Sequence, residues 1–263
     1  MERKCRFVPL SKQPLVLVLC QVRFTPVQMA QYMPAIQEEF RRNGYPLVSA
    51  GKIQQLLITA TGPQVVEQER WEYRTKDETR SIFVMPDNVT LQTTSYTKFE
   101  VFAEQLRFVL DTVLTKTEHN TLGLVQRIGL RYVDLIRPEA GQDYRSFLKP
   151  GLHGVADQTF EKGTHRLYVQ SVGKTAVGSL IIRVAQSDDG TDLPPDLVAG
   201  APKHEPRAKK DELVTFVDMD HSVTGKFNAD TQLVVEKLFR LHDDLVETFH
   251  EQVVTKEAIE SWR

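Results

Sequence analysis

The stretch Leu122–Pro138 reads LGLVQRIGLRYVDLIRP, and its pattern decides the expected fold. Apolar residues recur at every second position, which is the spacing of a β-strand whose side chains alternate between the two faces of a sheet. We therefore expect this stretch to be the central strand of an antiparallel sheet. Its better core face carries Leu124, Ile128, Leu130, Tyr132 and Ile136, with Gln126 and Asp134 near the ends.

The other face of this expected strand carries two arginines. Arg127 and Arg131 lie on either side of Gly129, roughly 13 Å apart at about 3.3 Å per residue. Glycine leaves space between two guanidinium groups, so two arrangements are open. The arginines either pair with carboxylates above the sheet or form an anion-binding floor, because a planar guanidinium suits carboxylate and phosphate.

The chain before this strand predicts one α+β unit, residues 1–118. It opens with a strand over Leu15–Phe24, followed by a helix that Pro34 should kink or restart. Thr97 and Glu100 have the spacing of a capping box, which predicts the start of a long amphipathic helix. Between the two helices we expect a meander of strands at residues 53–59, 66–74, 80–85 and 88–94.

The chain from residue 119 to 263 predicts a second unit of similar order. A short helix is expected at 142–148, and Asn228 or Asp230 should cap a long final helix whose solvent face includes His242. Further strands are expected at residues 165–172, 176–185 and 213–220, the first two joined by a turn at Gly173-Lys174.

Residues 187–212 differ in composition from the rest of the second unit. They read SDDGTDLPPDLVAGAPKHEPRAKKDE, which is rich in proline, glycine and charge. A loop of this length is usually functional or disordered, so we expect a flexible, solvated insertion. Its apolar pair Leu197 and Val198 is the expected contact for a partner.

The fold class that these elements predict is α+β, with duplicated β-α-β(n)-α units. The two units would share one curved antiparallel sheet, with both long helices on one face and a pseudo-two-fold axis, as one compact domain. This layout resembles the TATA-binding-protein-like architecture. A shared architecture implies little about function.

Three sequence stretches carry a resemblance to a known family. PLVLVLCQVRF at 14–24, QRIGLRYVDLIRP at 126–138 and LFRLHDDLVETFHEQVVT at 238–255 resemble a sporadically distributed bacterial protein family of about this length. The resemblance implies an accessory role beside a larger effector, in mobile or antiviral-defence loci of the CRISPR or toxin–antitoxin type. It defines no catalytic residues.

The composition indicates which kinds of partner and which compartment to expect. The chain has 263 residues and a net charge of −2, which argues against non-specific nucleic-acid binding over the whole surface. Cys5 and Cys20 have no metal-binding spacing, and the apolar strand around Cys20 predicts a buried free thiol. No segment has 18 consecutive apolar residues, so we expect a cytoplasmic protein without a membrane association.

The sequence contains none of the common catalytic or nucleotide-binding motifs, so no catalytic residue or cofactor is assigned. The first hypothesis is therefore a non-enzymatic accessory protein that binds another protein, encoded nearby. A second is a single-stranded nucleic-acid or nucleotide binder, whose arginines converge on the sheet. Its anion-binding candidates are Arg23, Arg127, Arg131 and Arg183.

A third hypothesis is a metal-dependent enzyme. Asp218 and Asp220 are two residues apart on an expected strand and so share a face, with His221 next to them. Carboxylates suit a hard divalent cation, and Glu161 is a candidate for a further ligand. The alternative is a strand end whose carboxylates are solvated.

Overall fold

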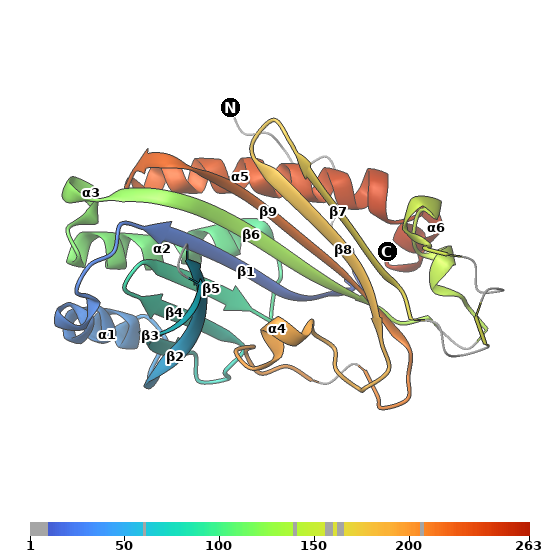
Figure 1. Ribbon diagram of the computed structural model, residues 1–263, viewed down its shortest axis with the longest axis horizontal. Coiled ribbons are helices and arrows are strands. Elements are labelled where there is room, and N and C mark those ends of the chain that lie inside the picture. Colours follow the sequence, from blue (N-terminus) through green and yellow to red (C-terminus); the bar gives the residue numbers. More distant parts are fainter. Residues whose placement is uncertain (1–9, 60–61, 139–140, 156–159, 162–165, 206–207) are drawn as a thin grey trace.

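The computed structural model describes residues 10–59, 62–138, 141–155, 160–161, 166–205 and 208–263, the side chains of 55–59 excepted. Within these residues, nine strands form one antiparallel sheet (Figure 1). The strands are β1 (Leu15–Phe24), β2 (Leu47–Thr59), β3 (Gly62–Arg74), β4 (Arg80–Met85), β5 (Asn88–Thr93), β6 (Leu124–Ile136), β7 (Tyr168–Lys174), β8 (Ser179–Ser187) and β9 (Val214–Asn228). Their order across the sheet is β2-β3-β4-β5-β1-β6-β9-β8-β7.

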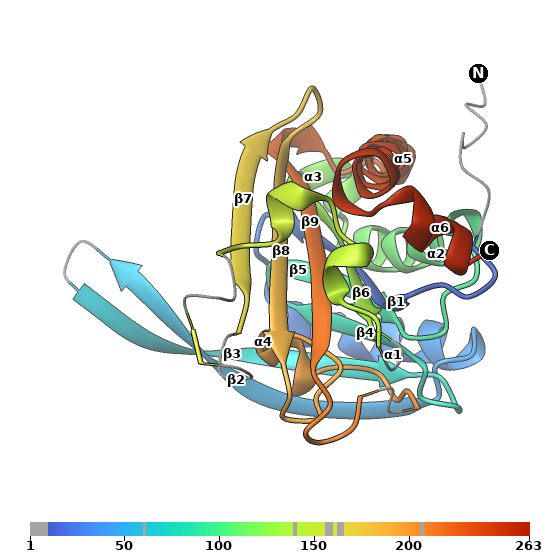
Figure 2. The same cartoon turned by 90° about the vertical axis from the view of Figure 1, so that its right-hand side faces the viewer.

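Two long helices and several short ones accompany the sheet. The described helices are α1 (Met33–Arg42), α2 (Phe99–Lys116), α3 (His119–Leu122), α4 (Pro195–Val198), α5 (Thr231–Thr248) and α6 (Lys256–Ser261). Helix α5 packs on β6 and β9 and contacts α2, and the two long helices lie side by side in Figure 2. None of the described helices is long and apolar enough to cross a membrane.

The strand expected at Leu122–Pro138 is confirmed as β6, which lies between β1 and β9 near the middle of the sheet. Its core face is also confirmed over most of its length, because Ile128, Leu130, Tyr132 and Ile136 are buried. The start of the strand differs. The pairing with β9 shifts register between Val125 and Arg127, so Val125 is buried there in place of Leu124.

The main core contains residues of both the sheet and the helices. Alternate residues of β1, from Val18 to Phe24, are buried in a cluster with residues of α1, α2 and α5. Cys20 belongs to this cluster, which confirms the buried free thiol. Burial raises the pKa of the Cys20 thiol, so it remains protonated and unreactive at neutral pH.

His242 is buried, which corrects the expectation that it lies on the solvent face of the last helix. It stacks on Phe99 at 3.7 Å between ring centroids, and its Nδ1 lies 2.7 Å from the Tyr132 hydroxyl oxygen. Desolvation lowers the pKa of His242 to about 3. Because α5 contacts both the sheet and α2, it buries a wider arc than the single apolar stripe indicates.

Several expected boundaries are also corrected. Strand β9 continues to Asn228, eight residues beyond the expected end. The β7–β8 hairpin turns at residues 175–178 instead of Gly173-Lys174. Helix α2 begins after Lys98 without a side-chain cap, so the Thr97–Glu100 capping box is wrong, whereas Asp230 does cap α5 by accepting a hydrogen bond from the Leu233 amide.

Candidate binding surface

The four candidate arginines lie on one face of the sheet, which we call the arginine face. Residues directly opposite each other in antiparallel strands project to the same side. The register pairs Arg23 with Arg127, and it pairs Arg183 with Asp218, which in turn lies opposite Val133 on β6. Arg131 has the same parity as Arg127, so β1, β6 and β8 all contribute to this face.

Arg127 fills the space above Gly129 with its own guanidinium. A Cβ atom at position 129 would lie 2.5 Å from Arg127 Nη1, which shows how closely the group covers the glycine. Its Nη2 lies 3.4 Å from Asp220 Oδ1, and its Nη1 lies 3.4 Å from Gln21 Oε1. The gap expected between two guanidinium groups is therefore occupied.

Arg131 binds two carboxylates at once. Its Nε and Nη2 donate to Asp218 at 2.7 and 2.8 Å, and its Nη1 donates to Asp196 at 2.7 Å. Partial burial alone would raise the pKa of the Asp196 carboxyl, but the hydrogen bonds from Arg131 outweigh it and lower the pKa. Such bidentate pairs are among the stronger polar contacts in proteins.

The remaining two arginines are also paired. Arg183 Nη1 lies 3.0 Å from Asp218 Oδ2, and the exposed Arg23 donates to Asp87 at 2.8 Å. Around the middle of the face, three arginines (127, 131 and 183) face three aspartates (196, 218 and 220), so their formal charges cancel. Of the two open arrangements, the structure has the carboxylate-paired one; anion binding by these arginines stays a prediction.

The three metal-site candidates do not converge. Asp218 and Asp220 share the arginine face, as expected, and both already contact arginines. His221 points to the opposite face, where it is buried with Nδ1 3.1 Å from the Leu241 carbonyl oxygen and Nε2 2.9 Å from Thr175 Oγ1. Over the part of the chain that the structure describes, no group of three or more His, Cys, Asp or Glu residues has the arrangement of a metal site.

The segment expected to be a flexible insertion, residues 187–212, contacts the arginine face through residues that the structure describes, all but 206–207. Its residues Leu193 and Ala208 are buried in a second apolar cluster with Val133 and Leu135 of β6. The segment is therefore part of this cluster, together with Leu17 of β1 and Phe216 of β9. Its flexibility stays a prediction, but its contacts define where it lies.

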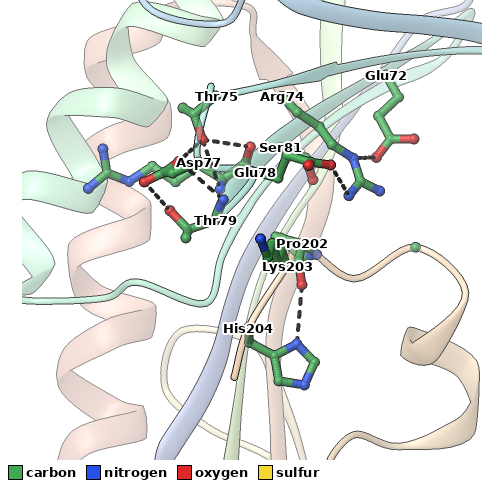
Figure 3. A network of polar contacts seen from close by, with 12 residues as sticks. Glu72, Arg74, Thr75, Asp77, Glu78, Thr79, Ser81, Pro202, Lys203 and His204 are labelled. Carbon is green, nitrogen blue, oxygen red and sulfur yellow. Dashed lines mark hydrogen bonds and ion pairs between the residues drawn. The ribbon is translucent and has the colours of Figure 1, made fainter. Parts of the chain in front are cut away.

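Hydrogen bonds attach Lys203 of this segment to the β3–β4 turn and to the residue that follows β5. The Lys203 amide donates to the Glu78 carbonyl at 2.9 Å, and Figure 3 shows Lys203 next to this turn. Thr94 Oγ1 donates to the Lys203 carbonyl at 2.6 Å. In between, Leu197 packs against the second cluster, while Val198 of the same short helix is exposed. Val198 is therefore the more exposed member of the expected partner-contact pair.

A projecting pair of strands was missed by sequence reasoning. β2 and β3 pair along their whole length, from Leu47 opposite Arg74 to Thr59 opposite Gly62. β4 pairs with only the last four residues of β3, Trp71–Arg74. Residues 51–59 and 62–70 thus form a two-stranded arm, which Figure 2 shows extending away from α2 and α5. The alternation of apolar and polar residues predicted strands here. Nothing in their sequence indicated that β4 pairs with only the last four residues of β3.

Near its base the arm contacts the rest of the chain, because Gln68 Nε2 donates to Asp87 Oδ1 at 3.0 Å and the Arg70 guanidinium lies 4.7 Å from the centroid of the Phe83 ring. Lys52 and Glu67 form a cross-strand ion pair at 3.2 Å, but both side chains are exposed. The side chains of Val65 and Val66 are exposed too, at 64% and 40%. An isolated two-stranded ribbon is marginally stable in water. Adjacent residues of a strand project to opposite faces, so Val65 and Val66 place one exposed apolar side chain on each face of the arm.

Comparisons with known proteins do not show which family this chain belongs to. No family model matches the chain, and neither does any curated protein or solved structure. The function is therefore inferred from the chain's own residues.

Proposed function

We propose that this protein is a non-enzymatic, cytoplasmic accessory subunit that binds another protein through the arginine face and the arm. The observation that carries this proposal is the arm, residues 51–59 and 62–70, which exposes Val65 and Val66 on strands without a further neighbour. A protein partner would cover these side chains and stabilise the ribbon.

Charge favours a protein over nucleic acid as the partner. Nucleic-acid affinity comes largely from lysines and arginines that neutralise phosphates and release counterions. Each candidate arginine here has an aspartate within 3.4 Å, so a phosphate would have to displace a carboxylate. A protein interface needs no such exchange, because paired charges are compatible with its polar rim.

The proposal includes the origin of the fold. From the middle of the sheet outward, one half runs β1, β5, β4, β3, β2 and the other runs β6, β9, β8, β7, so the first half has one additional strand at its edge. Each half begins with an inner strand and ends with a long helix, α2 or α5. This order supports a duplication of units 1–118 and 119–263, with the long helices on one face, in a TATA-binding-protein-like layout.

The family resemblance supplies the proposed setting. A member of a sporadically distributed bacterial family would act beside a larger effector in a mobile or antiviral-defence locus. The partner would then be encoded by a neighbouring gene.

The test is recovery of a partner from native cells with wild type and with the Val65→Lys/Val66→Lys variant. We expect a stoichiometric protein partner with wild type, retained after nuclease treatment, and its loss with the arm variant. The matched control is Leu122→Lys/Val155→Lys, which adds the same charge at two other exposed apolar residues. Thermal unfolding should be unchanged in both variants.

Retention of the partner by the arm variant would contradict the role of the arm. Loss of the partner on nuclease treatment would instead indicate a contact through nucleic acid.

A further inference from the structure

We propose that the outer edge of β7 binds an extended segment of the partner protein, which adds a tenth strand to the sheet. The inference rests on the proposed function and specifies the form of the partner. It comes from the main chain of β7, an element separate from the arm.

β7 is the last strand of the sheet, and its pairing identifies which of its main-chain groups are unused. It pairs with β8 without a register shift, from Tyr168 opposite Ala185 to Lys174 opposite Ser179. Beyond one end, the Thr175 amide donates to the Gly178 carbonyl at 2.8 Å; beyond the other, the Gln186 amide donates to the Leu167 carbonyl at 3.0 Å. Both bonds involve an odd-numbered residue of the first strand.

Hydrogen-bonded and non-hydrogen-bonded pairs alternate along an antiparallel ladder. The odd-numbered residues Val169, Ser171 and Gly173 therefore direct their amides and carbonyls toward β8. The even-numbered residues direct theirs outward, away from the sheet. These outward residues are Tyr168, Gln170, Val172 and Lys174.

The side chains of these outward residues also lie on one face. Gln170 is opposite Arg183, so all four project from the arginine face. Tyr168 and Val172 are 66% and 65% exposed, and Lys174 is exposed at the end of the strand. Between them, the Gln170 side chain accepts hydrogen bonds from Arg183 Nε and the Tyr168 hydroxyl, each at 3.1 Å.

Along the edge, the side chains that project from the arginine face are therefore, in order, apolar, amide, apolar and basic. A fitting segment is extended, with apolar residues opposite Tyr168 and Val172 and an acidic residue opposite Lys174. Such strand addition takes its affinity from main-chain hydrogen bonds and its specificity from alternate side chains.

Within the part of the chain that the structure describes, β7 also lacks the features that usually protect a sheet edge. Natural proteins block edges with proline, inward charges, bulges or a covering element. The strand reads YVQSVGK, with no proline and its one charge at the end, and its register is continuous. An unpaired edge with exposed apolar side chains fits a docking strand.

The test uses a peptide as the probe, acetyl-Glu-Thr-Val-Thr-Thr-Thr-Val-amide, with its first residue opposite Lys174 and its last opposite Tyr168. Amide exchange is followed by NMR on the full chain at millimolar peptide. In the free protein we expect fast exchange at Gln170 and Val172 and slow exchange at Ser171 and Gly173. Peptide at about ten times its Kd should slow the outward amides roughly tenfold and leave the inward ones unchanged.

Two matched controls make the result specific to the edge. N-methylation of the third and fifth peptide residues blocks the amides that face β7 and should abolish binding, whereas N-methylation of the second and sixth should not. In the protein, Val172→Pro removes one outward amide without touching the β8 ladder and should weaken binding roughly tenfold. Val172→Thr keeps the amide and the side-chain shape, and we expect an unchanged Kd.

Other outcomes would overturn the inference. Exchange that the peptide leaves unchanged, or slows at Ser171 and Gly173 as much as at Gln170 and Val172, would overturn the inference. Outward amides already protected in the free protein, with a dimer in sedimentation, would replace the partner segment by a second copy of the chain. If peptide binding fails while the arm variant still loses its partner, only the β7 inference falls and the proposed function stands.

Discussion

Arg131 and Asp134 lie three positions apart on β6, on opposite faces of the sheet, and both side chains are mostly buried. Arg131 is held by the carboxylates of Asp218 and Asp196. The Asp134 carboxyl receives no hydrogen bond from any described residue, and burial raises its pKa to about 8. On this strand, pairing decides which buried side chain stays charged at neutral pH.

The largest loss of stability should follow from removal of a carboxylate that pairs with Arg131. Asp218→Ala leaves Arg183 without a carboxylate and Arg131 with only Asp196. Removal of one member of a buried ion pair leaves an uncompensated charge, so we expect a loss of about 3–5 kcal/mol in the free energy of unfolding. Urea unfolding at pH 7 measures it.

Asp220→Ala is the control for this prediction. Its carboxylate is more exposed and lies farther from its arginine, at 3.4 Å. We expect a loss of about 1 kcal/mol or less. Equal losses for the two variants would show that the Arg131 site is no more important than its neighbour.

Substitution of Asp134 should change the free energy of unfolding by a smaller amount and in the opposite direction. Well below pH 3.8, Asp134 is protonated in both the folded and the unfolded chain, so Asp134→Asn should change little. Between its unfolded pKa of 3.8 and its folded pKa of about 8, the folded chain holds one more proton, so wild-type stability falls as pH rises. Asparagine has no such penalty, and we expect a gain of about 1–3 kcal/mol at pH 8.

Thermal unfolding of both proteins from pH 4 to pH 8 checks this sign. The difference between them should grow with pH. A difference that is constant across the range would mean that Asp134 is ionised in the fold.

The smallest effect is expected at the exposed end of the Arg131 pair. Asp196 is more than half exposed, so Asp196→Asn should cost about 1 kcal/mol or less. Proteolysis within residues 187–212 should nevertheless become faster, because Asp196 attaches this segment to the sheet. Unchanged proteolysis would show that the buried Leu193 and Ala208 alone hold it.

The sequence predicted what depends on local pattern. The alternation in β6 gave the strand, its core face and the common face of Arg127 and Arg131, since two-residue periodicity is a property of the strand itself. The Arg131–Asp196 contact joins residues 65 positions apart across a segment without periodicity, so no local signal indicated it.

Errors arose where tertiary contacts override local preference. His242 follows Leu241 of the apolar stripe, and the contact of α5 with α2 buries it. The arm depends on the short length of β4, and the edge of β7 depends on the strand order of the whole sheet. Neither property is encoded in the residues of β3 or β7 alone.

The most direct test of the central claim is titration of the full chain with a labelled single-stranded oligonucleotide at low salt, followed by fluorescence anisotropy. Because each arginine of the arginine face pairs with a carboxylate, we predict that micromolar wild-type protein does not bind the oligonucleotide. We predict the same for Arg127→Ala. Binding that weakens steeply with salt and is reduced in Arg127→Ala would contradict the account and make the arginine face a phosphate-binding surface.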